Sequence, residues 1–413
     1  MTTPDSRIQA AGSSGHEHHF NLRQSFAEPS ANLSSHNMHD MRQYFLSRFG
    51  NYDFADYIVE LLRDDASEPL LIPAHGLLLT RSPGLRPLMN FSPKDRGSKY
   101  TRLPIPRQYY FKEPDAFVEA LRYLYGGELL DGNRFLQGLP PFQTGSKEVQ
   151  DDLEARMQYV LSYVAAGRSM ALPEPLFHGS YIASRLIRWE TLEVMLLFLS
   201  GEQMEVGRSD NSWTDPTTCT QLLQDLANYI VLNFPTDFAF DTNARQLPSL
   251  PRLPEPVAHD SRTNVFPDNV NAGTRHRRFE SIRFGEVSAN QDPSSLASNI
   301  LSSVLLSVQF PVLKSIVEHG ALCDRLGTAE VTRYMHIIVA EREKRRLEAL
   351  KHMQQQQSSG QGIGGTTTTA TSNLYWQEAV QASEKSQVGY TLTRHRVYDA
   401  VTSSESMPAA APA

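Results

Sequence analysis

Alternating apolar and polar residues predict a pair of strands near the start of the chain. Residues 55–62 place Tyr57, Val59 and Leu61 on one face of a strand and more polar side chains on the other. After a polar stretch, a second short apolar run follows at residues 70–72. Two such runs joined by a polar turn are typical of a β-hairpin.

A third strand and a helix follow the predicted hairpin. Residues 101–105 favour a strand, and Pro104 assigns that strand to the edge of a sheet because proline lacks the N–H that a central strand needs. The helix begins at Pro114, where a first-turn proline is tolerated, and its apolar positions recur at helical spacing from Phe117. Gly126 and the glycine after it predict its end.

Helical periodicity dominates the remainder of the chain. The apolar stripes lie at residues 153–164, 192–199, 219–230, 296–317 and 328–353. Strands followed by helices, without regular alternation, predict an α+β fold with an all-helical C-terminal region. This order of elements argues against a dinucleotide-binding fold, in which strands and helices alternate.

Composition divides the chain into four parts. Residues 1–37 are polar and lack hydrophobic periodicity, so we expect a disordered arm. A folded domain is expected at residues 38–200 and a helical region at 201–353, which contains a proline-rich loop at 240–293. Residues 354–413 are rich in Gln, Gly, Thr, Pro and Ala at their two ends, which predicts a flexible tail.

Charge and cysteine content narrow the possible classes of protein. The chain has 39 Lys and Arg against 46 Asp and Glu, a formal charge of −7, so general coating of nucleic acid is not expected. Two cysteines fit a reducing compartment, which places the protein inside the cell, in the cytoplasm or nucleus. No run of 18 apolar residues and no secretory leader is found, so membrane association is not expected.

Motifs for catalysis are missing from the sequence. It contains no nucleophile elbow, phosphate-binding loop or zinc-protease motif, so we assign no catalytic residue, cofactor or metal and expect a non-enzymatic protein. The cluster at residues 16–19 contains three histidines, but it lies in the arm, where nothing orients the rings for a specific metal site.

Two basic clusters are candidates for phosphate contacts or nuclear import. They are residues 275–278 and residues 342–346. In the second cluster, neighbouring glutamates offset the cations, which we interpret as a solvated helix face with ion pairs. A nuclear regulator that touches nucleic acid is therefore kept as a hypothesis, although nucleic acid is not an expected partner.

A short amphipathic helix precedes the first strand. Its apolar stripe consists of Met38, Met41, Phe45 and Phe49. Such a helix either packs on its own domain or packs against a second copy, and the sequence leaves both options open. Methionine-rich faces are adaptable contact surfaces.

Several short motifs follow one another in the first block at a characteristic spacing. They are Phe54-x-Asp56 opening the strand, Ile72-x-Ala74-His75 at the end of the hairpin, Ser82 followed by Leu85 and Leu88, and Pro114-x-x-Phe117 leading to Tyr123-Leu124-Tyr125-Gly126-Gly127. In this order the motifs resemble the BTB/POZ domain, over about residues 38–200. Further motifs resemble the C-terminal part of uncharacterised filamentous-fungal BTB proteins: Phe234 to Asp241, Leu250 to Leu253, Arg283 to Glu286 and Val339 to Arg346.

The resemblance implies a three-stranded sheet with flanking helices and a non-enzymatic role in protein–protein interaction. Many members form homodimers through a leading helix, which favours contact of the Met38–Phe49 stripe with a second copy. Asp56 and His75 fall at family positions as candidate interaction residues. For His75, a buried imidazole that bonds to the backbone near a helix start is the simpler interpretation. In transcription-factor members a basic residue follows the histidine, whereas this chain has Gly76.

The resemblance also implies an alternative role as a substrate adaptor for a cullin-type ubiquitin ligase. Members with this role carry a hydrophobic-x-Glu motif after the third helix. The corresponding stretch here has Phe91, but Pro93 stands where the glutamate is needed. The adaptor role is therefore an alternative to the interaction role that we favour.

Overall fold

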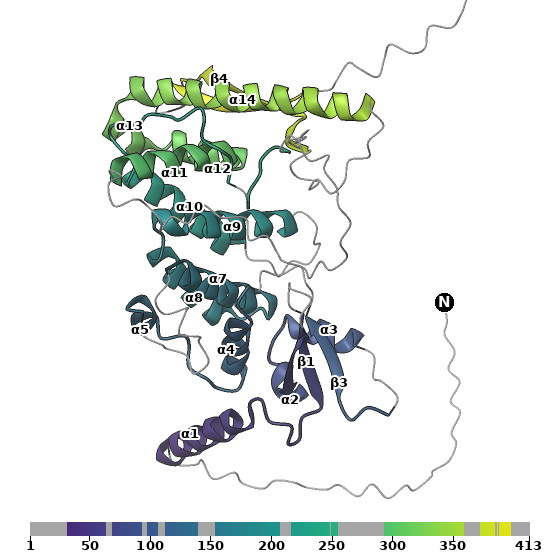
Figure 1. Cartoon of the computed structure of the whole chain (residues 1–413). Coiled ribbons are helices and arrows are strands. Elements are labelled where there is room, and N and C mark those ends of the chain that lie inside the picture. Colours follow the sequence, from purple (N-terminus) through teal and green to yellow (C-terminus); the bar gives the residue numbers. More distant parts are fainter. Residues whose placement is uncertain are drawn as a thin grey trace, which may run out of the picture.

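The protein is a mixed α+β structure, described here from a computed structural model. The structure describes residues 31–62, 68–92, 97–105, 112–138, 153–206, 216–247, 249–254, 293–358, 372–384, 386 and 388–397. Figure 1 shows that the elements are stacked roughly in chain order, from a small sheet at one end to a long helix, α14, at the other.

The N-terminal sheet contains the predicted hairpin and the predicted third strand. Its strands are β1 (Tyr57–Leu61), β2 (Leu70–Ala74) and β3 (Thr101–Ile105), in the order β2-β1-β3. β1 pairs with β2 in antiparallel and with β3 in parallel orientation. Val59 and Leu61 on the central strand are buried, as the alternating pattern predicts, and Ile58 on the opposite face is buried as well.

Pro104 lies on an edge strand, in agreement with the prediction. The backbone N–H of Thr101 donates to the carbonyl oxygen of Asp56 at 2.9 Å. Because alternate residues of a strand face the same neighbour, the nitrogens of residues 101, 103 and 105 point toward β1 and that of Pro104 points away. The proline therefore removes no hydrogen bond from the sheet.

The first half of the chain also contains helices that accompany this sheet. They are α1 (Ala31–Arg48), α2 (Gly76–Leu79), α3 (Leu85–Phe91), α4 (Pro114–Leu124), α5 (Gly132–Leu136), α7 (Leu153–Ser169) and α8 (Pro173–Arg185). α4 has its proline in the first turn and is followed by Gly126 at a φ of +86°, as predicted. α1 begins at Ala31, inside the stretch expected to be a disordered arm; no glycine or proline interrupts residues 31–37.

The second half is a stack of helices, as predicted. It comprises the short 3-10 turn η1 (Trp189–Thr191), α9 (Leu192–Val206), α10 (Pro216–Leu232), α11 (Pro293–Ser307), α12 (Phe310–Val317), α13 (Gly320–Leu326) and α14 (Thr328–Ser358). α10 contacts α8 and α9 on one side and α12 and α13 on the other. The expected domain boundary at residue 200 falls inside α9, and one continuous hydrophobic core crosses it.

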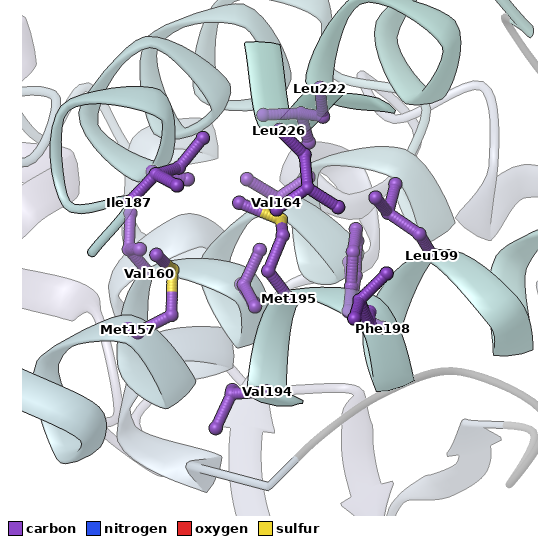
Figure 2. Packing of buried hydrophobic residues seen from close by; sticks show 14 of the residues in the cluster. Met157, Val160, Val164, Ile187, Val194, Met195, Phe198, Leu199, Leu222 and Leu226 are labelled. Carbon is purple, nitrogen blue, oxygen red and sulfur yellow. The ribbon is translucent and has the colours of Figure 1, made fainter. Parts of the chain in front are cut away.

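Figure 2 shows how this core joins the two halves. Side chains from α7, α9 and α10 converge there: Met157, Val160, Val164, Met195, Phe198, Leu222 and Leu226. All of them are buried. Removing these apolar surfaces from water is the main force that holds the helices together.

A second sheet near the C-terminus was not predicted. β4 (Trp376–Ala382) and β5 (Tyr390–Arg396) form an antiparallel hairpin beside α14 and α12. The predicted all-helical region and flexible tail at 354–413 are therefore wrong for this segment. Its inward positions combine Leu392, buried at 1% exposure, with the charged Glu378, buried at 3%. A charged residue on the inward face hides the alternation that identifies a strand.

Residues 234–254, which include the first part of the predicted proline-rich loop, pack on the helices. Phe234 and Phe238 lie against the ring of Tyr334 on α14, and the Tyr334 hydroxyl donates to the carbonyl of Phe238 at 2.7 Å. Farther along, Leu247 and Leu253 are buried. We call residues 234–254, of which all but 248 are described, the strap. Residues 255–292 of the predicted loop lie outside the described residues.

Candidate interaction surface

One face of α1 is anchored to its own domain. Phe45 and Phe49 pack against the core, and the rings of Phe49 and Tyr125 meet edge to face with centroids 5.0 Å apart. The Arg42 side chain donates to the carbonyl of Gly126 at the end of α4. Two residues of the predicted stripe are therefore used inside the molecule.

The other face of α1 is open. Met41 is 57% exposed, and Tyr44, one turn farther along, is 52% exposed. The side chain of Met38 lies outside the described residues. Contacts with Tyr125 and Gly126 decide this division, because residues 41 and 45 are four apart and lie near each other on the helix.

The loop after α1 adds an exposed aromatic side chain beside this face. Phe54 is 80% exposed and has a φ of +60°, a left-handed conformation that is uncommon for a residue other than glycine. The guanidinium carbon of Arg48 lies 5.0 Å from the ring centre of Tyr44 and 5.8 Å from that of Phe54. Strained backbone is often found where a side chain is displayed for contact.

His75 holds this loop in place. Its Nε2–H donates to the carbonyl oxygen of Asp53 at 2.9 Å, and its Nδ1 lies 3.0 Å from the Tyr125 hydroxyl, from which it accepts. The backbone N–H of His75 donates to the same hydroxyl at 2.9 Å. Burial raises the pKa of Tyr125 to about 12; the bond from the His75 backbone opposes this effect and the charge of Asp56 adds to it. The half-buried His75 thus makes the backbone bond of the simpler interpretation.

Asp56 is bonded to the start of α2. Its Oδ1 accepts a hydrogen bond from the backbone N–H of Gly76 at 2.6 Å, a favourable place for a carboxylate at a helix N-terminus. A Cβ atom at residue 76 would lie 2.7 Å from Asp56 Oδ2 and 2.7 Å from the ring of Tyr57. A side chain at residue 76 would therefore require Asp56 or Tyr57 to move.

Sequence reasoning missed Tyr44, Arg48 and Phe54. Tyr44 has a recognisable signal, because it lies three residues after Met41 and therefore on the same side of the helix. Phe54 has none, since its left-handed backbone depends on the hydrogen bonds that hold the loop. We call Met41, Tyr44 and Phe54 the α1 surface.

A second candidate surface lies between α8 and α10. A groove of about 360 Å³ runs between the two helices; Phe177 and Tyr181 are exposed on its α8 side, and Asp225 and the buried Leu222 line its α10 side. Elsewhere, Phe91 at the end of α3 is 85% exposed. These apolar side chains could bury surface only against another molecule or a rearranged segment.

The predicted solvated basic face of α14 is partly wrong. Arg342 is fully buried: its Nε donates to Glu378 Oε2 at 2.7 Å and its Nη1 to the Leu305 carbonyl at 2.6 Å. Arg346, 4% exposed, donates from Nε to Glu343 at 2.8 Å. The hairpin and the strap cover these arginines, and neither element was predicted to pack there.

Glu378 is the central acceptor of this cluster. Arg252 on the strap places its Nη1 3.4 Å from Glu378 Oε1, opposite Arg342. Burial by itself would raise the pKa of Glu378, but the charge and hydrogen bonds of Arg342 and the charge of Arg252 lower it to about 2. Burial and the charge of Arg342 lower the pKa of Arg252 to about 9, so its guanidinium stays protonated at neutral pH. We call Glu378, Arg342 and Arg252 the Glu378 cluster.

These contacts bear on nucleic-acid binding, because phosphate contacts need exposed cations. Arg342 and Arg346 are not available for them, which disfavours this helix as a phosphate-binding element. Residues 275–278, the other basic cluster, lie outside the described residues, as does the histidine cluster at 16–19.

Within the described part of the chain, no group of three or more His, Cys, Asp or Glu side chains is arranged to hold a metal ion. Among the same residues, no helix has the length and apolar character needed to cross a bilayer. Comparison of the chain with protein-family models, curated proteins and solved structures finds no match.

Proposed function

We propose that the protein is a non-enzymatic protein-interaction protein that self-associates through the α1 surface of a BTB/POZ-like domain. The observation that carries this proposal is the division of α1: Phe45 and Phe49 anchor the helix, while Met41 and Tyr44 face outward beside Phe54. The order of the motifs, the small mixed sheet and the leading helix support the BTB-like assignment.

The physical basis of the association is burial of apolar surface. Met and aromatic residues are enriched at the centres of protein interfaces, and removing apolar surface from water contributes about 25 cal/mol per Å². In a two-fold symmetric dimer the same patch serves both partners, so each protomer would bury its own copy of every side chain of the α1 surface. Arg48 beside the two rings supplies a polar edge.

The test uses residues of the open face, because a charge at Phe45 would also disrupt internal packing. We expect Met41→Glu combined with Tyr44→Glu to convert a dimer to a monomer in light scattering, since the symmetric contact would place carboxylates opposite each other. The matched control is Leu232→Glu with Leu347→Glu, at exposed apolar positions of α10 and α14, which is expected to remain dimeric. A wild-type monomer at about 100 µM, a concentration far above the Kd of a stable dimer, would contradict the proposal.

A role as substrate adaptor for a cullin-type ubiquitin ligase is the second candidate. The exposed Phe91 favours it, because this residue occupies the hydrophobic position of the expected motif. Capture of a purified cullin N-terminal domain on the immobilised full chain, weakened by Phe91→Ala but not by Leu77→Ala, would support this role. Leu77 is a suitable control because it is similarly exposed on α2.

A further inference from the structure

An arginine-lined cavity of about 340 Å³ lies where α5, α7 and the end of α8 meet. Its lining residues are Leu136, Leu153, Arg156, Arg185, Leu186 and Arg188. They come from α5, from α7, from α8 and from the turn that joins α8 to η1. Among the lining residues that the structure describes, three carry guanidinium groups and none carries a carboxylate.

Hydrogen bonds to the backbone hold two of the guanidinium groups in position. The Nη1 of Arg156 donates to the carbonyls of Phe135 and Leu136 at the end of α5, at 3.2 Å each. The Nη1 of Arg188 donates to the carbonyl of Ile187 at 2.6 Å. By themselves these bonds are an ordinary structural use of arginine at helix ends.

Donors remain after these bonds are made. The Nε of Arg156 is buried and has no acceptor within the described residues. Arg185 bonds through Nη1 to the Tyr181 hydroxyl at 3.1 Å, which leaves its other donors for a ligand. Within the residues that the structure describes, no carboxylate forms an ion pair with Arg156, Arg185 or Arg188. A guanidinium normally satisfies several of its five donors, so this site matches an oxyanion.

The framework of the cavity is rigid. α7 packs along α8 and against η1, and Figure 2 shows Ile187 directed toward Met157 and Val160 of α7. The segment that carries Arg185 and Arg188 is thus fixed to the helix that carries Arg156. Donors that are held in place before binding lose little entropy when a ligand arrives.

We propose that this cavity binds an acidic side chain of a partner polypeptide. The guanidinium groups match a carboxylate, and the three leucines that complete the lining match the apolar part of an acidic segment. The described lining residues include no aromatic ring on which a nucleobase would stack, so a peptide fits better than a nucleotide. This inference rests on the proposed function as a protein-interaction protein, but it involves a surface separate from the α1 surface.

The experiment measures binding of a fluorescein-labelled peptide of alternating Glu and Leu to the full chain by fluorescence anisotropy. A peptide of alternating Gln and Leu is the reference, and we expect it to bind about tenfold or more weakly because it lacks the carboxylates. Arg185→Gln combined with Arg188→Gln is expected to weaken binding of the Glu peptide by a similar factor. Equal binding of both peptides, or equal binding by wild type and variant, overturns the proposal.

The control variant must change net charge equally at another place. Arg102→Gln with Lys344→Gln removes two exposed cations from β3 and α14, and we expect it to bind the Glu peptide like wild type. A loss equal to that of the cavity variant means general charge attraction and contradicts the site. The self-association test does not change these cavity residues, so failure of either proposal can be recognised separately.

The chain's own acidic residues need a separate variant, because Asp151 and Asp152 directly precede Leu153 in the sequence. We expect Asp151→Asn with Asp152→Asn to bind the Glu peptide with the affinity of wild type. Binding that appears only in this variant shows that the chain itself supplies the carboxylate, and it overturns the assignment to a partner.

Discussion

Arginines gather at two places in this molecule, and the two differ in their counter-charge. In the Glu378 cluster, Arg342 and Arg252 are buried with a carboxylate between them. In the cavity, Arg156, Arg185 and Arg188 line open space together with leucines. The same side chain stabilises the fold where a carboxylate compensates its charge, and it is available to a ligand where none does.

The difference also follows from the elements that carry the arginines. In the Glu378 cluster, the strap, α14 and β4 are far apart in sequence, and the ion pairs connect them. In the cavity, α5, α7 and α8 are neighbours that already share a hydrophobic core. The first site therefore holds separate segments together, whereas the second is not needed for that purpose.

The largest expected effect is the loss of the central carboxylate. Glu378→Gln keeps the shape but leaves the buried Arg342 and Arg252 without a counter-charge, so we expect the free energy of unfolding to fall by about 3–5 kcal/mol. Urea unfolding followed by circular dichroism measures this change. The control is Glu330→Gln, which breaks a half-exposed pair with Arg333 and is expected to change stability by less than about 1 kcal/mol. Equal effects of the two variants would mean that the Glu378 cluster does not stabilise the fold.

The second expected effect is a dependence of stability on acid. The pKa of Glu378 is about 2 in the folded protein, below its ordinary value of 4.5. A lowered folded-state pKa contributes stability that is complete above pH 4.5 and is lost as the pH falls toward 2, here about 3 kcal/mol. Urea unfolding between pH 7 and pH 3 should show the gap between wild type and Glu378→Gln narrowing over this range. A constant gap contradicts the assigned ionisation.

Local patterns made part of the first half of the chain predictable. Strands β1 to β3 and helix α4 follow from alternation, from Pro104 and Pro114, and from the terminal Gly126, all of which act within a few residues. Of the two helices that carry cavity arginines, α7 was predicted from its stripe, whereas α8 was not. The convergence of Arg156 and Arg188 was not predicted either, because it depends on how α7 packs against the end of α8.

The Glu378 cluster could not be predicted because its partners are distant in sequence. Arg342 and Glu378 are 36 residues apart, and Glu378 lies on a strand that its own charge disguises. In α1, spacing identified Met41 and Phe45 as apolar but did not show which of them faces the core. That distinction depends on Tyr125 and Gly126, which come from another helix end.

An intermediate effect is expected inside the cavity itself. Arg156 is the most enclosed of its three arginines, and Arg156→Gln removes its bonds to the carbonyls of Phe135 and Leu136. We expect the free energy of unfolding to fall by about 1.5–3 kcal/mol, the range for lost hydrogen bonds that involve a charged donor. Thermal unfolding measures the change. A loss as large as that of Glu378→Gln would show that the two sites do not differ as proposed.

The smallest effect on stability is expected for the loss of the two exposed arginines of the cavity. Arg185→Gln combined with Arg188→Gln removes two exposed charges that have no carboxylate partner in the described structure, so we expect stability to change by less than about 0.5 kcal/mol. At low salt the change should favour the variant slightly, because it removes repulsion among like charges that salt otherwise screens. Urea unfolding at two salt concentrations measures both quantities. A large destabilisation would show that these arginines maintain the fold, and the cavity would then belong to the same class as the Glu378 cluster.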